Sequence, residues 1–169
     1  MYGQSSVGLS KQLDIEQEEA AKFMDAYFDR YPGVDKFLNQ ILEECPRTGY
    51  VSTILGRRRA IRGIRPGVSR QRNLPERTAI NTVIQGSAAD LIKQSMINVH
   101  RRLKQENSPA RMLLQIHDEL VFECPEEHVA SLAPIVREEM EQDLKVSVPI
   151  KVDIAAGPNW LEQTPLDAE

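Results

Sequence analysis

Residues 113–123 read LLQIHDELVFE, so that apolar residues run into a His-Asp-Glu triplet and out of it again. This pattern predicts two short strands joined by a tight turn, with Asp118 at or beside its tip. Such a turn lifts Asp118 and Glu119 out of a buried sheet, and neighbouring carboxylates suit a hard cation such as Mg2+. The stretch therefore indicates metal-assisted chemistry on a phosphate-bearing substrate. The alternative is a plain solvated turn, in which Asp is common because of its backbone geometry.

The size and composition of the chain predict one globular domain. It has 169 residues, of which 41% are hydrophobic, enough for a core of its own. No apolar run approaches the length of a membrane span, and no secretory leader is recognisable. Cys45 and Cys124 lack the spacing of a zinc site, which favours reduced cysteines in an intracellular protein.

The charge of the chain is unevenly distributed. Its net charge is −4, but residues 57–77, here called the basic segment, contain eight arginines, no lysine and one acid, Glu76. Arginine makes planar, bidentate contacts with phosphates and base edges. The segment therefore predicts a surface for a polyanion such as nucleic acid. The alternative is a solvated basic loop that pairs with acidic neighbours on the same protein.

The order of the predicted elements favours an α+β fold with an antiparallel sheet covered on one face by helices. Residues 1–13 read as a helix tail and a turn, and Asp14 is placed to cap the helix that follows. Pro46 and Gly49 are expected to end the second helix, and the tail from Gln163 to fray. The predicted helices are 15–31, 34–45, 74–105 and 126–144, and the predicted strands are a hairpin within 50–61, the hairpin at 113–123 and a last strand at 150–155.

Three polar residues lie four apart on the longest predicted helix: Arg77, Asn81 and Gln85. In a helix this spacing places them along one ridge roughly 12 Å long. Small residues follow at 86–89, and small residues allow another backbone to approach closely. Side chains of these types can bind base edges in a groove of a duplex. The alternative is that the ridge is simply the solvent-exposed face of an amphipathic helix.

Several stretches, in this order along the chain, resemble family A DNA polymerases of the bacterial DNA polymerase I type. Residues 72–91, RNLPERTAINTVIQGSAADL, are similar to the long palm helix of that family, and residues 114–123 to its third polymerase motif. Residues 49–59, GYVSTILGRRR, resemble its fingers hairpin. Tyr2-Gly3 with Gly8-Leu9-Ser10 resembles the end of its nucleotide-binding helix, and residues 157–160 its C-terminal strand end. The resemblance extends to about Leu161.

The resemblance implies a two-metal centre that binds Mg2+ at the His-Asp-Glu turn. Asp118 would be a ligand of the catalytic metal pair, Glu119 an auxiliary carboxylate beside it, and His117 a contact to the primer end. Two metals would activate the primer hydroxyl and stabilise the leaving pyrophosphate. The implied reaction is template-dependent addition of deoxynucleotides to a primer 3′ end, in DNA replication and repair.

The resemblance also implies the nucleic-acid contacts. Arg77, Asn81 and Gln85 would line the minor groove of the new primer–template duplex, where the acceptors are shared by all base pairs and report pair geometry. Tyr2 would lie by the incoming deoxynucleoside triphosphate and the templating base. Further contacts to DNA would come from the fingers hairpin, through Arg57, Arg58 and Arg59.

The same resemblance divides the chain and predicts that it is a fragment. Residues 1–71 would be the C-terminal part of the fingers, 72–162 the palm, and 163–169 a polar tail. The first catalytic Asp of the family lies on an earlier strand without a counterpart here, so the isolated chain is predicted to be inactive and to need the remainder of the polymerase chain. A truncated palm sheet would expose an unpaired edge. The implied location is the bacterial cytoplasm, at the nucleoid, with no membrane.

Three other functions fit parts of the pattern. A non-catalytic DNA-binding module would use the arginines and the ridge and treat Asp118 as a turn residue. A metal-dependent nuclease or phosphatase would use the same carboxylates to cleave. A structural α+β domain would use the basic segment to contact another protein.

Overall fold

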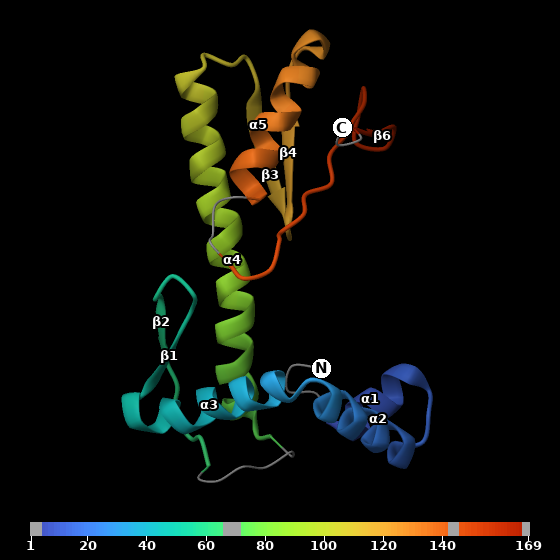
Figure 1. The fold of residues 1–169 in the computed structure, drawn as a ribbon, viewed down its shortest axis with the longest axis vertical. Coiled ribbons are helices and arrows are strands. Elements are labelled where there is room, and N and C mark those ends of the chain that lie inside the picture. The colour runs from blue at the N-terminus through green and yellow to red at the C-terminus, as the bar shows by residue number, and fades with distance from the viewer. Residues whose placement is uncertain (1–4, 66–71, 142–145, 167–169) are drawn as a thin grey trace. The chain divides into compact units, whose positions relative to one another are not determined.

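The structure is a computed structural model that describes residues 5–65, 72–141 and 146–166 (Figure 1). The chain forms two compact units, Met1–Ala88 and Ala89–Glu169. Its described part is mainly helical, and the strands found there form three separate two-stranded antiparallel sheets. The α+β class is confirmed, although three small sheets replace the single sheet that the sequence predicted. None of the helices in the described ranges has the length and hydrophobicity that a membrane crossing needs.

The first unit begins with two helices, α1 (Ser6–Leu13) and α2 (Gln17–Arg30). The predicted turn was wrong, because the Ser5 side chain caps a complete two-turn helix. The helix tail predicted before it falls on residues 1–4, which lie outside the described residues. Asp14 ends α1 in the left-handed conformation, with a φ of 54°, and does not cap α2. A short polar side chain suits either helix end, since Asp also tolerates the left-handed region.

The third helix, α3 (Pro32–Thr48), is longer than the sequence predicted. Pro46 lies within its last turn, where the missing N–H costs only one helical hydrogen bond. The helix ends at Gly49, which has a φ of 78° and whose N–H donates to the Cys45 carbonyl at 2.8 Å. A left-handed glycine is the usual way to close a helix, so the predicted stop at Gly49 is correct and the stop at Pro46 is wrong.

The predicted hairpin follows at once, as β1 (Tyr50–Ser52) and β2 (Arg58–Ala60). Gly56 turns the chain between the strands with a φ of 81°. Figure 1 shows the hairpin against the N-terminal part of the long helix α4 (Leu74–Gln105). The buried core of this unit joins α3, the hairpin and α4, and consists of Ile41, Cys45, Val51, Ile61 and Ala79.

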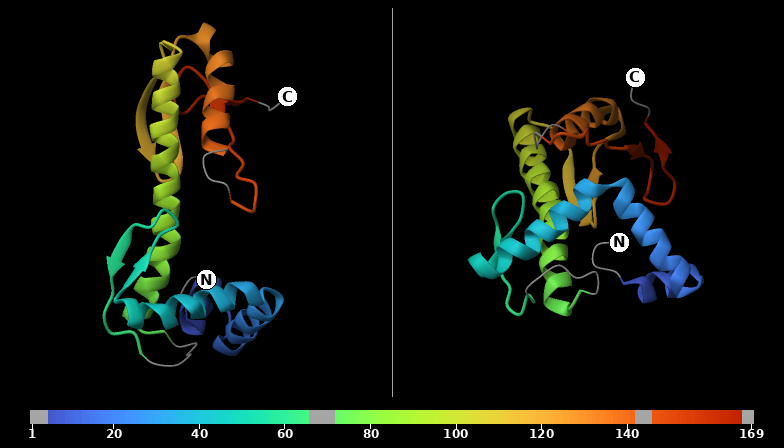
Figure 2. Two further views of the ribbon diagram at one scale, coloured as in Figure 1. Left: turned by 60° about the vertical axis from the view of Figure 1, so that its left-hand side comes forward. Right: turned by 60° about the horizontal axis from the view of Figure 1, so that its bottom comes forward.

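The second unit packs a hairpin and a helix against the C-terminal half of α4. The hairpin consists of β3 (Arg111–Ile116) and β4 (Glu119–Glu123), and a turn of 3₁₀ helix leads into α5 (Val129–Glu141). Figure 2 shows the hairpin beside this half of α4 in both of its views. Met112 and Phe122 reach the core from the strands. The buried residues of this core are Val99, Leu103, Leu132 and Val136.

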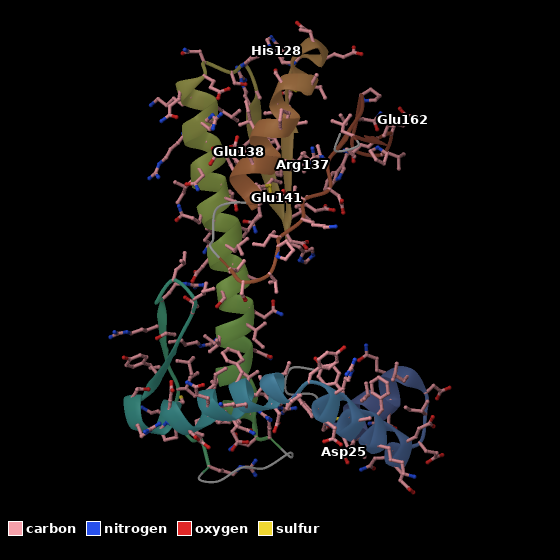
Figure 3. All side chains as sticks on the ribbon, viewed as in Figure 1. Asp25, His128, Arg137, Glu138, Glu141 and Glu162 are labelled. Carbon is pink, nitrogen blue, oxygen red and sulfur yellow. The ribbon has the colours of Figure 1, made fainter. Side chains whose placement is uncertain are left out.

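Polar contacts tie the other segments of this unit to α5, several of whose side chains are labelled in Figure 3. Arg102 of α4 forms ion pairs with Glu138 and Glu139 of α5, at 3.8 and 3.2 Å. The Val152 N–H donates to Glu141 Oε1 at 2.9 Å, and Arg137 Nη2 donates to the Leu166 carbonyl at 3.3 Å. The last two bonds connect backbone groups of the C-terminal segment to side chains of α5.

The C-terminal segment differs from its prediction. Residues 150–154 form no strand, and the strands of this segment are β5 (Ala155–Ala156) and β6 (Thr164–Pro165). Residues 164–166 therefore pair back onto the chain where fraying was expected. Gly157 permits a close approach within the connection between them, because a Cβ there would lie 1.8 Å from the Glu162 carbonyl oxygen. Strands of two residues are too short to show an alternating pattern, so the sequence could not predict them.

Candidate functional site

The His-Asp-Glu triplet lies at the tip of the β3–β4 hairpin, as the sequence predicted. Ile116 pairs with Glu119, which leaves His117 and Asp118 as a two-residue turn. His117 has a φ of 54°, and its carbonyl accepts a hydrogen bond of 2.9 Å from Gln115 Nε2. His117, Asp118 and Glu119 are all exposed. The hairpin thus presents an imidazole and two adjacent carboxylates to solvent.

His117 has a left-handed backbone, so two substitutions can distinguish the contribution of its conformation from that of its imidazole. A β-branched residue resists this conformation, so His117→Val is expected to destabilise the hairpin by about 1–2 kcal/mol. His117→Gly removes the same imidazole without that strain and is expected to leave the hairpin intact. Amide hydrogen exchange over residues 111–123 measures both effects. Equal protection in the two variants would show that the turn conformation does not constrain this position.

The carboxylates meet part of what a divalent cation needs. Asp118 and Glu119 supply oxygen ligands, the type that Mg2+ prefers. Within the ranges that the structure describes, no three Asp, Glu, His or Cys side chains gather as a metal-binding group. Two adjacent carboxylates fall short of a two-metal centre, which brings several carboxylates around its ions. The described residues therefore supply part of the ligand set of such a centre.

The polar ridge lies on α4 in the first unit. Arg77, Asn81 and Gln85 are exposed, while Ala79 and Ile80 between them are fully buried. The helix thus buries one face in the core and turns the ridge to solvent. The ridge belongs to the first unit and the His-Asp-Glu turn to the second.

The three arginines of the hairpin differ in their surroundings, although all are exposed. Arg57 Nη2 donates to the Gly86 carbonyl at 3.0 Å, and Arg59 Nη1 donates to Thr82 Oγ1 at 3.1 Å. The Arg58 guanidinium lies 4.6 Å from the centre of the Tyr50 ring, in a cation–π contact. The sequence analysis gave all three arginines the same role. Side chains alternate between the two faces of a strand, however, so Arg57 and Arg59 contact α4 and Arg58 does not share their face.

Glu76 has a structural role that the sequence interpretation missed. It accepts a bidentate ion pair from Arg65, from Nε at 2.9 Å and from Nη2 at 2.8 Å. It also forms a reciprocal cap with Asn73: the Asn73 N–H donates to Glu76 Oε2 at 2.7 Å, and the Glu76 N–H donates to Asn73 Oδ1 at 2.9 Å. This is a capping box, and the spacing Asn-x-x-Glu was the signal that could have revealed it.

The surroundings of Glu76 stabilise its charged form. The hydrogen bonds from Arg65, reinforced by the backbone N–H groups of Asn73 and Arg65, lower the pKa of Glu76 to about 2 although burial opposes this. Burial lowers the pKa of Arg72, while the nearby Asp35 and Glu76 oppose that shift. One acid thus organises the start of α4 and neutralises part of the basic segment, which supports the alternative of internal pairing for Arg65.

The remaining sequence-predicted nucleotide contact, Tyr2, lies outside the described residues. So do residues 66–71 of the basic segment, which include Arg70. The described site therefore comprises two surfaces: the ridge with the adjacent arginine hairpin, and the His-Asp-Glu turn.

Comparison with known proteins matches nearly the whole chain. Residues 1–162 match the model of DNA polymerase family A. The DNA polymerase I of Geobacillus stearothermophilus is 46% identical over 162 residues, which are 96% of this chain and 18% of that protein. The DNA polymerase I of Bacillus subtilis (strain 168) is 44% identical over the same shares.

A solved structure has a similar fold. The POL domain of Pol1 from M. smegmatis, in complex with DNA primer-template and dNTP, superposes with a TM-score of 0.80 at 43% sequence identity. The match covers 89% of this chain and 26% of that one. The chain thus spans 18% of the length of both curated relatives and about a quarter of the solved domain.

Proposed function

Because the chain belongs to DNA polymerase family A, we propose that it is part of a template-directed DNA polymerase, which adds deoxynucleotides to a primer 3′ end. The observation that carries the proposal is the match over residues 1–162, which includes both the ridge on α4 and the turn with Asp118. The relatives that span the same residues are DNA polymerases I, and the similar solved domain holds primer-template DNA and dNTP.

The ridge would read the minor groove of the product duplex. Arg77, Asn81 and Gln85 are exposed at successive turns of one helix, and each can donate hydrogen bonds. The minor-groove acceptors of A·T and T·A pairs are alike, and G·C pairs add one donor. Donors placed along this groove can therefore test the geometry of a base pair without selecting a sequence, as a copying enzyme requires.

The arginine hairpin would bind the phosphate backbone. Arg57 and Arg59 donate to α4, and both side chains are exposed, so their positive charge lies at the surface where a phosphate backbone would bind. Arg58 stacks on Tyr50 and keeps its charge at the surface. Such contacts are independent of sequence and weaken as salt rises.

The His-Asp-Glu turn would provide part of the catalytic centre. Asp118 would be a metal ligand, Glu119 a neighbouring carboxylate and His117 a contact to the primer end. The proposed metal is Mg2+, because its preferred ligands are carboxylate oxygens and its usual partners are substrate phosphates. When bound, a metal pair supplies an activated primer hydroxyl and stabilises the leaving group. The further carboxylates would come from the remainder of the polymerase chain.

The other assignments follow from this function. Residues 1–71 would belong to the fingers and 72–162 to the palm, with 163–169 as a tail, and Tyr2 would contact the incoming nucleotide. Replication and repair of a bacterial genome would place the whole protein in the cytoplasm, at the nucleoid. The support for these assignments is the family match and the bacterial relatives.

Primer extension tests the proposal. The full-length protein, given primer–template DNA, the four deoxynucleoside triphosphates and Mg2+, is expected to extend the primer, whereas residues 1–169 alone are expected to bind the duplex without extending it. The reason is that the described part of this chain brings no third carboxylate to Asp118 and Glu119.

Each other outcome favours a different function. Mg2+-dependent cleavage of DNA without nucleotides would identify a nuclease. Binding without extension by the full-length protein would identify a DNA-binding module. Failure to bind a duplex even at low salt, where phosphate contacts are strongest, would favour a structural domain.

A further inference from the structure

The β1–β2 hairpin grips α4 directly beside the polar ridge. Thr82 follows Asn81 and Gly86 follows Gln85, so these two contacted residues each lie one step of about 100° around the helix from a ridge residue. We call this set of contacts the clasp. Its members are Thr53, Ile54, Arg57 and Arg59 of the hairpin, and Thr82, Gly86 and Ser87 of α4.

The clasp depends on a close approach at Gly86. A Cβ at this position would lie 2.6 Å from Thr53 Cγ2 and 3.6 Å from Arg57 Nη2. The first distance is far below van der Waals contact, so any side chain here would push the hairpin away. Thr53 cannot yield easily, because it is buried and its Oγ1 accepts a hydrogen bond from the Arg57 N–H at 3.1 Å. Glycine at this step of α4 thus permits the hairpin to touch the helix backbone.

Hydrogen bonds hold the two elements together across this contact. Arg57 Nη2 donates to the Gly86 carbonyl at 3.0 Å, and the Ile54 N–H donates to Ser87 Oγ at 2.9 Å. The hairpin side is itself rigid, since the Thr53 N–H donates to the Arg57 carbonyl and the Gly56 N–H to the Thr53 carbonyl, both at 2.9 Å. Arg57 is therefore fixed at its backbone by the hairpin and at its guanidinium by the helix.

The gripped turn of α4 has little helical stability of its own. Glycine in a helix interior costs about 1 kcal/mol relative to alanine. Ser87 Oγ donates to the Val83 carbonyl, and bonds of this kind slightly destabilise and often bend helices. Contacts from outside the helix therefore have a large influence on the geometry of this turn, which carries Gln85.

We infer that Arg57 is a positioning residue, which through the clasp fixes the turn of α4 that presents Asn81 and Gln85 to the nascent base pair. The inference rests on the proposed function, because the ridge matters only if it reads the duplex. To discriminate, a hydrogen-bond donor must keep its distance from the acceptor to within a few tenths of an ångström of the usual value, about 2.9 Å for N–H···O. Loss of the clasp would thus lower the selectivity for correct pairs more than the affinity for DNA.

Two variants break the clasp from opposite sides. Arg57→Met removes the guanidinium and keeps the aliphatic stem. Gly86→Ala places a Cβ against Thr53 but raises the helix propensity of α4, by about 1 kcal/mol. Positioning by the clasp predicts that both variants raise misincorporation. If only the stability of α4 mattered, Gly86→Ala would reduce misincorporation.

The main measurement is the ratio of kcat/KM for correct and incorrect nucleotides, with the full-length protein. Both variants are expected to lower this ratio about tenfold, since small misplacements at a reacting site have effects of this size or larger. Arg62→Met, which removes the same charge from an exposed position of the basic segment, is expected to weaken duplex binding as much as Arg57→Met but to keep the ratio. An unchanged ratio in Arg57→Met, or an equal loss in Arg62→Met, would overturn the inference.

Asn81→Ala and Gln85→Ala separate this inference from the proposed function. If the wild-type protein does not extend primers, or these two variants keep full selectivity, the proposed reading of the duplex fails. If they lose selectivity and Arg57→Met does not, only the clasp inference fails.

Hydrogen exchange gives a readout that is independent of activity. In the full-length protein, Arg57→Met is expected to speed amide exchange at residues 85–90 while β3 and β4 keep their protection. Unchanged exchange at 85–90 would contradict the clasp. Rapid exchange throughout the chain would mean that Arg57→Met is unfolded. In that case Arg57→Lys, which keeps the charge but not the planar guanidinium, is expected to show the same local effect in a folded chain.

Discussion

Asp118→Asn is expected to abolish primer extension by the full-length protein, with a loss of at least about 1000-fold in kcat. Asn has the same shape and suits the same turn between β3 and β4, so the hairpin should stay folded. It removes the negative charge that the proposed Mg2+ site requires. Single-turnover extension on a primer–template measures the loss, and fluorescence anisotropy on the same duplex is expected to show little change in affinity.

A carboxylate elsewhere on the hairpin provides the matched control. Glu123 is exposed at the far end of β4, opposite Arg111, and Glu123→Gln removes one negative charge there. Its extension rate is expected to match the wild type. Extension by Asp118→Asn at the wild-type rate would contradict the role proposed for Asp118 and would leave the His-Asp-Glu triplet as an ordinary turn.

Glu76→Gln is expected to destabilise the first unit by about 2–3 kcal/mol at neutral pH. The side chain is only 5% exposed, and its pKa falls from the ordinary 4.5 to about 2 in the folded chain. A lowered pKa of this kind contributes stability above pH 4.5, and that contribution is lost as the pH falls towards 2. Gln can keep the hydrogen bond from the Asn73 N–H but has no second oxygen to accept from Arg65 Nε, so the variant removes the charge together with the bidentate ion pair.

Urea unfolding of the chain at several pH values measures this effect. The difference in unfolding free energy between Glu76→Gln and the wild type should be constant from pH 8 to about pH 5 and should shrink below that. The control is Glu18→Gln, which breaks an exposed ion pair with Lys22 that spans one helical turn. Such pairs contribute about 0.5 kcal/mol or less, so the control should barely differ from the wild type. A pH-independent difference for Glu76→Gln would contradict the shifted pKa.

The sequence predicted those parts of the fold that have a long and regular pattern. The helix α4 begins and ends where its apolar periodicity does, the β1–β2 hairpin lies within its predicted range, and the β3–β4 hairpin turns at the predicted residues. The resemblance to family A polymerases, carried by several separate motifs, is confirmed by the family match. These features depend on neighbouring residues along the chain, which is why a single sequence reveals them.

The sequence failed where two local signals compete or where a long-range contact decides. Asp14 carries a capping signal that fits the end of α1 as well as the start of α2. The different roles of Arg57 and Arg58 depend on which face of β2 meets α4, a fact of tertiary packing. The capping box at Asn73 and Glu76 was readable in principle, but the eight arginines around it directed the interpretation towards nucleic acid.

The irregularity in β3 affects any use of this chain as a separate reagent. The pairing of β3 with β4 shifts between Met112 and Leu114, and Leu113 and Leu114 are each about half exposed. Among the described strands, this sheet has only two members, so its outer edges offer unpaired backbone groups to other chains. Natural edge strands discourage such self-association with a charged side chain, most often lysine. Leu113→Lys is therefore expected to keep a concentrated preparation soluble, because it places a charge at a half-exposed position of this edge strand. The shift in register at the same position already limits how long an added strand could be.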